Sequence, residues 1–358
     1  MSPVTRVSLL AGLALLTLPR LISRSDAMTL LPAADARFRY EGRFDQSKPA
    51  APVVIWAGSR SGLEFEGGAL AVVFGRAAGQ NFFNVTVDGV TEIADAAAGR
   101  FAWPRPLGPG WHRLEIFKRS EADAGHVAFR GVELAAGAGT RAPAPTAYKL
   151  KIQFIGDSIT VGANNEDGAV DQWEDRRTHN HALSYGFLTA QAFAADHRAV
   201  AVSGMGICEG FVPMLAGETW DKVYPRDNPA RADLAAWQPD LVCVNLGEND
   251  DAFSRQQGHP FPAGFTKGYV ALVKSVRAAW PDANIVLLRG GMWGGAKGPD
   301  LRTAWAAAVR ELEAGDPRIS HFVFQHWSDH HPRVSDHRAM AGELTAWLKQ
   351  QPFMARFL

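Results

Sequence analysis

Between residues 38 and 134, apolar and polar side chains mostly alternate with a period of two. Gly, Pro, Asn and Asp separate these short runs at intervals typical of a β-sandwich or barrel. No stretch in this part has the apolar spacing of an amphipathic helix. The pattern therefore predicts an all-β domain over residues 28–136. Its runs are RFRYEGRF, VVIWAG, GLEFEG, ALAVVFG, NFFNVTVDG, HRLEIFKR and HVAFRGVEL.

From residue 148 onward, short apolar strands alternate with helical stretches. The strands are expected at KLKIQFIGDS, HRAVAVSG, DLVCVNLG, NIVLLRGG and HFVFQHW, and the helices near 181–196, 265–280, 300–314 and 335–349. Apolar strands that alternate with helices predict a parallel sheet covered on both faces. We therefore expect an α/β domain over residues 148–358. Residues 137–147, which are small and rich in Gly and Pro, are the predicted linker.

The N-terminus carries an uncharged apolar run over residues 7–18, directly behind Arg6. The run is too short to span a bilayer and fits the central region of a signal peptide, with a small-residue cleavage site from Ser25 to Ala27. Residues 1–27 are therefore predicted to direct export, which makes the protein periplasmic or secreted. A membrane anchor or a plain tail is the alternative interpretation.

Composition narrows the class of partner. The chain has 37 Lys and Arg against 37 Asp and Glu, and this zero net charge argues against a nucleic-acid partner. Its two cysteines, Cys208 and Cys243, cannot form a disulfide scaffold or a four-Cys zinc site. In a doubly wound sheet they would lie about 10 Å apart, so free thiols are expected. With no HExxH motif, we expect no metal and no cofactor. The sequence does not indicate an oligomeric state.

Polar motifs follow the predicted parallel strands at the edge where reactive groups gather in such sheets. Ser158 ends the first strand, Gly204 follows the second, Asn249 the third, and Asp329 and His331 the last. Ser158 is a candidate nucleophile, His331 its base, and Asp329 the carboxylate that orients the imidazole from two residues away. The N–H groups of Ser158 and Gly204 and the Asn249 amide are candidate oxyanion donors. Taken singly, each motif also fits an ordinary turn or helix cap.

Together, Gly-Asp-Ser, the Gly after the second strand, Gly-x-Asn-Asp and the late Asp/His pair resemble the four blocks of the SGNH (GDSL-type) hydrolases. The resemblance implies a flavodoxin-like three-layer α/β/α domain and the same roles for Ser158, Gly204, Asn249, Asp329 and His331. Many of these enzymes have Asp-x-x-His, whereas this chain has Asp-x-His-Pro.

That spacing, and a β-rich first domain with EGRF, WAGS, LEFEG and VTVDG, resemble carbohydrate esterase family two. Those enzymes are esterases of the acetylxylan type with an N-terminal jelly roll. Some members replace the Asp by a backbone carbonyl, so the resemblance leaves the role of Asp329 open.

Several residues are candidate substrate contacts. Trp293 lies in a Gly-rich loop after the fourth strand, where it either stacks on a sugar ring or fills a loop cavity. His330 is expected to border the acyl or sugar site, and Asp157 stands beside the nucleophile. Trp173 is expected to line or to shield the cleft.

The sequence thus predicts an exported serine esterase that removes O-acetyl groups from a polysaccharide or oligosaccharide through an acetyl-enzyme. The β-domain is expected to shape one wall of the cleft. Two alternatives stay open: a carbohydrate-binding protein with an inactive hydrolase domain, and a lipase or thioesterase for longer acyl chains.

Overall fold

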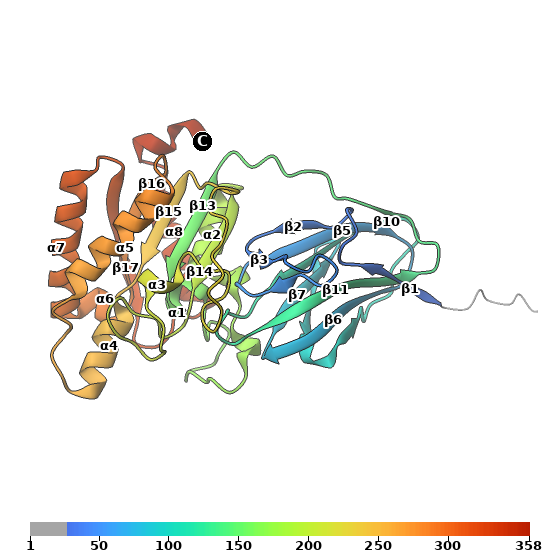
Figure 1. Cartoon of the computed structure of the whole chain (residues 1–358), viewed down its shortest axis with the longest axis horizontal. Helices are drawn as coiled ribbons and strands as arrows, with labels where there is room; N and C mark the ends of the chain where they lie inside the picture. Colours follow the sequence, from blue (N-terminus) through green and yellow to red (C-terminus); the bar gives the residue numbers. More distant parts are fainter. Residues whose placement is uncertain (1–26) are drawn as a thin grey trace, which may run out of the picture.

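A computed structural model describes residues 27–358, which form a β-sandwich followed by an α/β domain (Figure 1). The predicted export signal falls almost wholly on residues 1–26, outside the described residues. Within the described part of the chain, no helix is long and apolar enough to cross a membrane.

The first domain consists of two antiparallel sheets, which confirms the predicted all-β fold. The first sheet has the order β3 (Phe44–Asp45), β4 (Val53–Val54), β11 (Gly125–Ala135), β6 (Leu70–Gly79) and β9 (Arg100–Ala102), with β1 (Met28–Pro32) also paired to β11. The second has the order β12 (Thr140–Arg141), β5 (Arg60–Glu66), β10 (Trp111–Lys118), β7 (Phe82–Val87) and β8 (Val90–Asp95), with β2 (Arg39–Glu41) also paired to β5. A short turn of 3-10 helix, η1 (Ala96–Ala98), follows β8.

Alternation along the strands builds the core of the sandwich. In β5, Leu63 and Phe65 are fully buried, whereas their neighbours along the strand are partly exposed. From the facing sheets, Phe74 and Phe83 stack with their ring centroids 4.8 Å apart. The period of two in the sequence is therefore the period of burial, as expected for strands with one face in a core.

The predicted linker is not free of regular structure. Within residues 137–147, the two-residue strand β12 extends the second sheet by pairing with β5. An ion pair of 2.6 Å between Arg141 and Glu64 holds it there. Such a short strand leaves no periodic pattern, which is why the composition alone indicated only a linker. After β12 the chain runs back along the molecule to the second domain (Figure 1).

The second domain contains a five-stranded parallel sheet. Its order is β14 (Asp196–Ala201), β13 (Lys151–Gly156), β15 (Leu241–Asn245), β16 (Asn284–Met292) and β17 (Ile319–Ser328). The first strand thus lies between the second and the third, which is the flavodoxin-like order that the sequence predicted.

Helices cover both faces of this sheet. One face packs against α2 (Tyr185–Ala192) and α8 (Val334–Leu348), and the other against α3 (Ala216–Thr219), α5 (Phe265–Ala279) and α7 (Pro299–Gly315). Three helices begin at strand ends: α1 (Ser158–Val161), α4 (Glu248–Gln257) and α6 (Trp293–Lys297). The remaining turns are the 3-10 segments η2 (Arg176–Thr178), η3 (His181–Leu183) and η4 (Pro352–Phe357).

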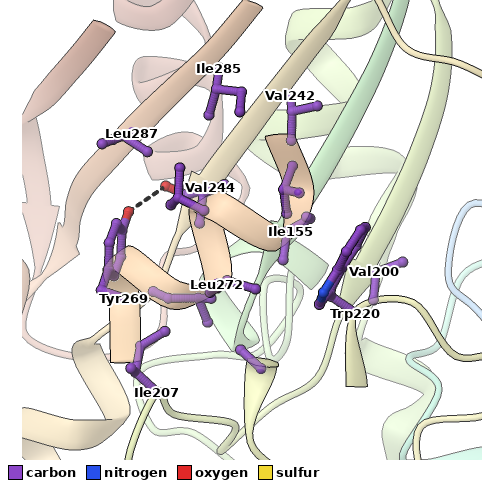
Figure 2. Close-up of a cluster of buried hydrophobic side chains, with 14 of the residues drawn as sticks. Ile155, Val200, Ile207, Trp220, Val242, Val244, Tyr269, Leu272, Ile285 and Leu287 are labelled. Carbon is purple, nitrogen blue, oxygen red and sulfur yellow. Dashed lines mark hydrogen bonds between the residues drawn. The ribbon is translucent and has the colours of Figure 1, made fainter. Parts of the chain in front are cut away.

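Successive residues of each strand point to opposite faces of the sheet. Val242 and Val244 point into the cluster beside α5, whereas Cys243 lies in the cluster with α2 and α8. Figure 2 shows the first of these clusters, in which the Tyr269 hydroxyl lies 3.4 Å from the carbonyl oxygen of Val244. Burial on both faces explains why the strands are almost wholly apolar. Cys243 and Cys208 are both free thiols, as expected.

The two domains share one core. Ile55 and Trp56 of the sandwich belong to the hydrophobic cluster of the α/β domain. The Trp56 indole N–H donates to the carbonyl of Val223 at 2.7 Å. Arg43, also from the sandwich, donates to the carbonyls of Trp220 and Lys222, each at 2.8 Å. Buried donors that are satisfied across the boundary tie the two domains into one packed body.

We expect Trp56→Ala to lower the free energy of unfolding by about 3–5 kcal/mol, because it empties a site that both domains fill. Trp111→Ala is the matched control, since Trp111 is 43% exposed, and its expected cost is about 1 kcal/mol or less. Urea unfolding followed by far-UV circular dichroism measures both. Equal losses in the two variants would contradict a shared core.

Candidate active site

A cleft of about 440 Å³ opens at the carboxyl ends of the parallel strands. Ser158, Gly204, Asn249 and His331, which come from four separate strand ends, all line it. This is the edge at which ligands bind in doubly wound sheets, and the volume suits a small ligand. The structure therefore brings together four of the residues that the sequence singled out.

Ser158 is presented by a tight strand-to-helix turn. Asp157 caps α1 by accepting the N–H of Ile159 at 3.0 Å, so Ser158 is the first helical residue. At Gly156 a Cβ would come 2.9 Å from the carbonyl oxygen of Asn245, which leaves room only for glycine. The Ser158 N–H has no protein partner within residues 27–358, and it faces outward from a helix start, where an anion is favoured.

His331 lies between a hydroxyl and a carboxylate. Its Nε2 is 3.0 Å from the Ser158 Oγ, and its Nδ1 is 2.6 Å from the Oδ2 of Asp171. A carboxylate only accepts hydrogen bonds, so Nδ1 carries the proton and Nε2 is free to accept one from the serine. This row of three side chains is the arrangement in which an imidazole acts as general base for a serine.

The prediction that Asp329 orients the imidazole is wrong: Asp171 occupies that position. Asp329 and His331 lie in a bend after β17, and Asp329 is exposed. Two-residue spacing places side chains together only in extended chain, and the chain here is not extended. His330 is also turned aside, with its Nδ1 2.9 Å from the Ser328 Oγ and 2.8 Å from the His331 carbonyl. It does not line the cleft.

Asp171 lies in the long loop between α1 and α2 and is held from two sides. Its Oδ1 is 2.7 Å from the Nη1 of Arg333, and its Oδ2 also accepts the backbone N–H of His331 at 3.2 Å. Burial by itself would raise the pKa of Asp171, but the hydrogen bonds from His331 and Arg333 hold that pKa well below its usual range. The carboxylate is therefore charged at neutral pH.

The candidate oxyanion donors surround the nucleophile. Gly204 has a φ of +80°, which favours glycine, and its N–H has no partner in the described chain. The Asn249 amide donates to the Met205 carbonyl at 3.0 Å and, more weakly, to Asp157 Oδ2 at 3.3 Å. The Ser158 and Gly204 N–H groups are thus unoccupied, whereas Asn249 reaches an oxyanion only by giving up its weaker contact.

Two other predicted substrate contacts lie outside the cleft lining. Asp157 is buried beneath it as the cap of α1, and burial together with the charge of Glu248 raises its pKa well above the usual range. Trp293 begins α6, and the Arg255 guanidinium covers its ring at 4.3 Å from the centroid. The preceding residue, Met292, which is the last residue of β16, lines the cleft instead.

The aromatic wall of the cleft comes from the Asp171 loop. Trp173 lines the cleft and is 37% exposed, with its ring centroid 5.0 Å from that of His331 in an edge-to-face arrangement. The guanidinium of Arg176 lies 4.8 Å from the same ring centroid. Of the two roles considered for Trp173, the structure favours lining.

The β-sandwich also reaches the cleft, as expected. Glu121 and Asp123, in the loop between β10 and β11, both line it. Neither belongs to a motif, and the sequence analysis missed them. Within residues 27–358 no cluster of three or more His, Cys, Asp or Glu side chains could hold a metal ion. In the His-rich stretch, His181 is buried, which lowers its pKa to about 4, and its Nδ1 is 3.0 Å from the Val161 carbonyl.

Comparison with known proteins gives the same two-part division. Residues 40–145 match the family model for the N-terminal domain of carbohydrate esterase 2. Residues 154–344 match the model of the GDSL-like lipase/acylhydrolase family.

Individual relatives extend this match over most of the chain. An acetylxylan esterase/glucomannan deacetylase of Cellvibrio japonicus is 26% identical over 98% of this chain and 99% of its own length. A cellulase/esterase of Acetivibrio thermocellus is 32% identical over 87% of this chain, but the match spans only 39% of that longer protein. A family two carbohydrate esterase from Clostridium thermocellum has been solved in complex with cellohexaose. It is 31% identical to this chain and superposes with a TM-score of 0.77. The match covers 87% of this chain and 98% of the other. The chain therefore belongs to family two of the carbohydrate esterases, within the GDSL-like lipase/acylhydrolase family.

Proposed function

We propose that this protein is a serine esterase that removes O-acetyl groups from a polysaccharide or oligosaccharide of the acetylxylan or glucomannan type. The observation that carries the proposal is the row Ser158–His331–Asp171, which opens into a cleft beside two unoccupied N–H donors. The substrate class is supported by the acetylxylan esterase/glucomannan deacetylase that matches along the whole chain.

In the first half-reaction, the Ser158 Oγ attacks the acetyl carbonyl carbon while the His331 Nε2 takes its proton. The carbonyl oxygen becomes an anion that the N–H groups of Ser158 and Gly204 stabilise, joined by the Asn249 amide. When the tetrahedral intermediate collapses, the bond to the sugar oxygen breaks. That oxygen takes the proton from His331 and leaves as a free hydroxyl.

In the second half-reaction, water gives a proton to the His331 Nε2 and attacks the acetyl-enzyme. A second tetrahedral intermediate collapses, the proton returns to the Ser158 Oγ, and acetate departs. Asp171 stays ionised throughout and stabilises the imidazolium that forms twice in each turnover. No step requires a cofactor.

The charges around the cleft favour a hydroxyl-rich substrate over a long acyl chain. Two lining side chains carry partly exposed polar groups, Arg176 and Asp123, whereas the carboxylates of Glu121 and Glu248 are already bonded within the protein. A guanidinium and a carboxyl group are good partners for sugar hydroxyls, whereas an alkyl chain placed against them would remove them from water without offering a hydrogen bond. The Arg176 guanidinium lies over the Trp173 ring, 4.8 Å from its centroid. The ring is still 37% exposed and lines the cleft, so its uncovered part can contact a sugar ring.

Export belongs to this proposal. A polymeric acetylated glycan lies outside the cell, and the apolar run at residues 7–18 is of the kind that directs secretion. We therefore propose that the enzyme acts in the periplasm or after secretion.

The direct test is acetate release from acetylated xylan and acetylated glucomannan, with Ser158→Ala as the blank. We expect turnover by the wild type and a loss of about 10³-fold or more in the variant, because no other group replaces the nucleophile. Wild-type turnover in Ser158→Ala would reject the mechanism. Activity on p-nitrophenyl esters that peaks at long acyl chains would reject the acetyl assignment, and glycan binding without any acetate release would indicate an inactive hydrolase.

Replacing Asp171 by Asn should lower kcat on p-nitrophenyl acetate by about 10²–10⁴-fold, because the amide no longer fixes the tautomer of His331 or stabilises its charged form. Asp329→Asn is the matched control and should stay within about twofold of the wild type, since surface changes away from a site have little effect. Initial-rate kinetics at neutral pH measure both. A larger loss of kcat in Asp329→Asn than in Asp171→Asn would show that Asp329 orients the imidazole.

We expect Trp173 and Trp293 to contribute differently to substrate binding. Trp173→Ala should raise KM for an acetylated xylo-oligosaccharide by about 5–10-fold, the value expected when an aromatic stacking contact is lost. Trp293→Ala should change KM by less than about twofold, because its ring is covered by Arg255 outside the cleft. Kinetics on the oligosaccharide decide between them, and a larger effect at Trp293 would overturn this assignment.

A further inference from the structure

A charged segment of the β-sandwich is buried beside the site. It begins with the last residue of β10 and runs Lys118-Arg119-Ser120-Glu121, and all four residues are at most 2% exposed. Charged side chains are seldom buried this completely unless each is paired. The segment lies between the turn that carries Gly204 and the loop that carries Asp171, and the contacts of Glu121 and Arg119 show how it joins them.

One oxygen of Glu121 holds the turn of the oxyanion hole. Its Oε2 accepts the backbone N–H of Ser203 at 2.8 Å. Ser203 immediately precedes Gly204, whose own N–H is a candidate oxyanion donor. Because a peptide unit is planar, this bond fixes the plane between Val202 and Ser203, which directly precedes the plane that carries the Gly204 N–H. The turn is also closed behind Gly204, where the N–H of Phe211 donates to the Gly204 carbonyl at 2.8 Å.

The other oxygen of Glu121 reaches the Asp171 loop. Its Oε1 lies 3.4 Å from the Nη1 of Arg176 and 3.5 Å from the Nδ1 of His179. Both partners belong to the same loop as Asp171. A single carboxylate therefore contacts the turn that supplies an oxyanion donor and the loop that supplies the partner of the general base.

These contacts keep Glu121 charged. Burial by itself would raise its pKa, but His179, the Ser203 N–H and Arg176 together lower the pKa to about 2. A buried negative charge beside an oxyanion hole would oppose the developing oxyanion if it stood alone. Arg176, which also lines the cleft, supplies the compensating positive charge.

Arg119 anchors the same segment to the loop. Its Nη2 donates to the carbonyl of Arg177 at 2.7 Å and forms an ion pair with Glu166. Its own carbonyl accepts the N–H of His181 at 3.0 Å. The position of Glu121 is thus determined by the sandwich domain and by the loop together.

We propose that Glu121 is a positioning residue for the esterase reaction: it acts through Ser203 to aim the Gly204 N–H at the oxyanion, which makes the β-sandwich part of the oxyanion hole. The proposal rests on the proposed function. The polar partners of Glu121 are Ser203, Arg176 and His179, and the nucleophile is not among them. Loss of Glu121 should therefore weaken stabilisation of the transition state and leave ground-state binding of a small ester nearly unchanged.

The test compares Glu121→Ala with Glu121→Gln on p-nitrophenyl acetate. The alanine variant loses the acceptor, and we expect kcat to fall by about 30–100-fold with KM within about threefold, somewhat less than the loss of an oxyanion donor itself. The glutamine variant keeps an acceptor oxygen and loses the charge, so its kcat should recover to within about 3–10-fold of the wild type. Glu64→Gln is the control, because Glu64 is paired with Arg141 on the sandwich surface, and its kcat should stay within about twofold.

A second readout reports the oxyanion hole directly. Phosphorylation of Ser158 by diethyl p-nitrophenyl phosphate places an oxygen where the oxyanion forms, and its rate should fall in Glu121→Ala by about the same factor as kcat. Thermal unfolding shows which variants fold. If Glu121→Ala does not fold, the glutamine variant decides: a kcat lowered by about 3–10-fold at unchanged KM supports the proposal, and a wild-type kcat overturns it.

The remaining outcomes are also decisive. A folded Glu121→Ala with a kcat within threefold of the wild type, a change in KM alone, or a glutamine variant as impaired as the alanine variant would overturn the proposal. Failure of the proposed function looks different, because the wild type and Glu64→Gln would then release no acetate. When both are active and Ser158→Ala is not, a negative result at Glu121 counts against Glu121 alone.

Discussion

The hydrogen bond of 2.6 Å between the Asp171 carboxylate and the His331 Nδ1 sets the chemistry of the whole cleft. It fixes which ring nitrogen carries the proton, and it thereby turns the other nitrogen toward the Ser158 hydroxyl. Three features of the structure support this contact. Arg333 holds the second carboxylate oxygen, the start of α8 fixes Arg333, and the parallel sheet places the serine and the histidine at the same edge.

The parts of the fold that were predictable are those that follow from periodicity. In β15 every residue is buried, and its sequence is almost wholly apolar. In β5 buried and more exposed residues alternate, and its sequence alternates in the same way. Ser158, Gly204, Asn249 and His331 could be found because the fold brings the carboxyl ends of the parallel strands together. Each of them lies within four residues of a strand end, so the sheet brings it to this edge.

What the sequence could not supply depends on loops. Asp171 and His331 are hydrogen-bonded but lie 160 residues apart in the sequence, so no motif spacing could link them. The two-residue spacing that favoured Asp329 holds in extended chain, and the bend after β17 removes that condition. Trp293 was likewise predicted to contact substrate because of its Gly-rich surroundings in the sequence. In the structure the Arg255 guanidinium covers its ring, and Met292 lines the cleft. The role of Glu121 arises only from packing between domains.

One loop carries both Asp171, which orients the base, and Trp173, which forms the aromatic wall. Its backbone is anchored by Arg333 at Gly168 and by Arg119 at Arg177. Reactivity and substrate fit are therefore mechanically linked in this enzyme. A lineage that lengthens or shortens this loop to admit a new glycan also shifts the carboxylate behind its histidine. Changes of substrate that keep turnover should consequently accumulate in lining side chains outside this loop, such as those of Phe211 and Val212.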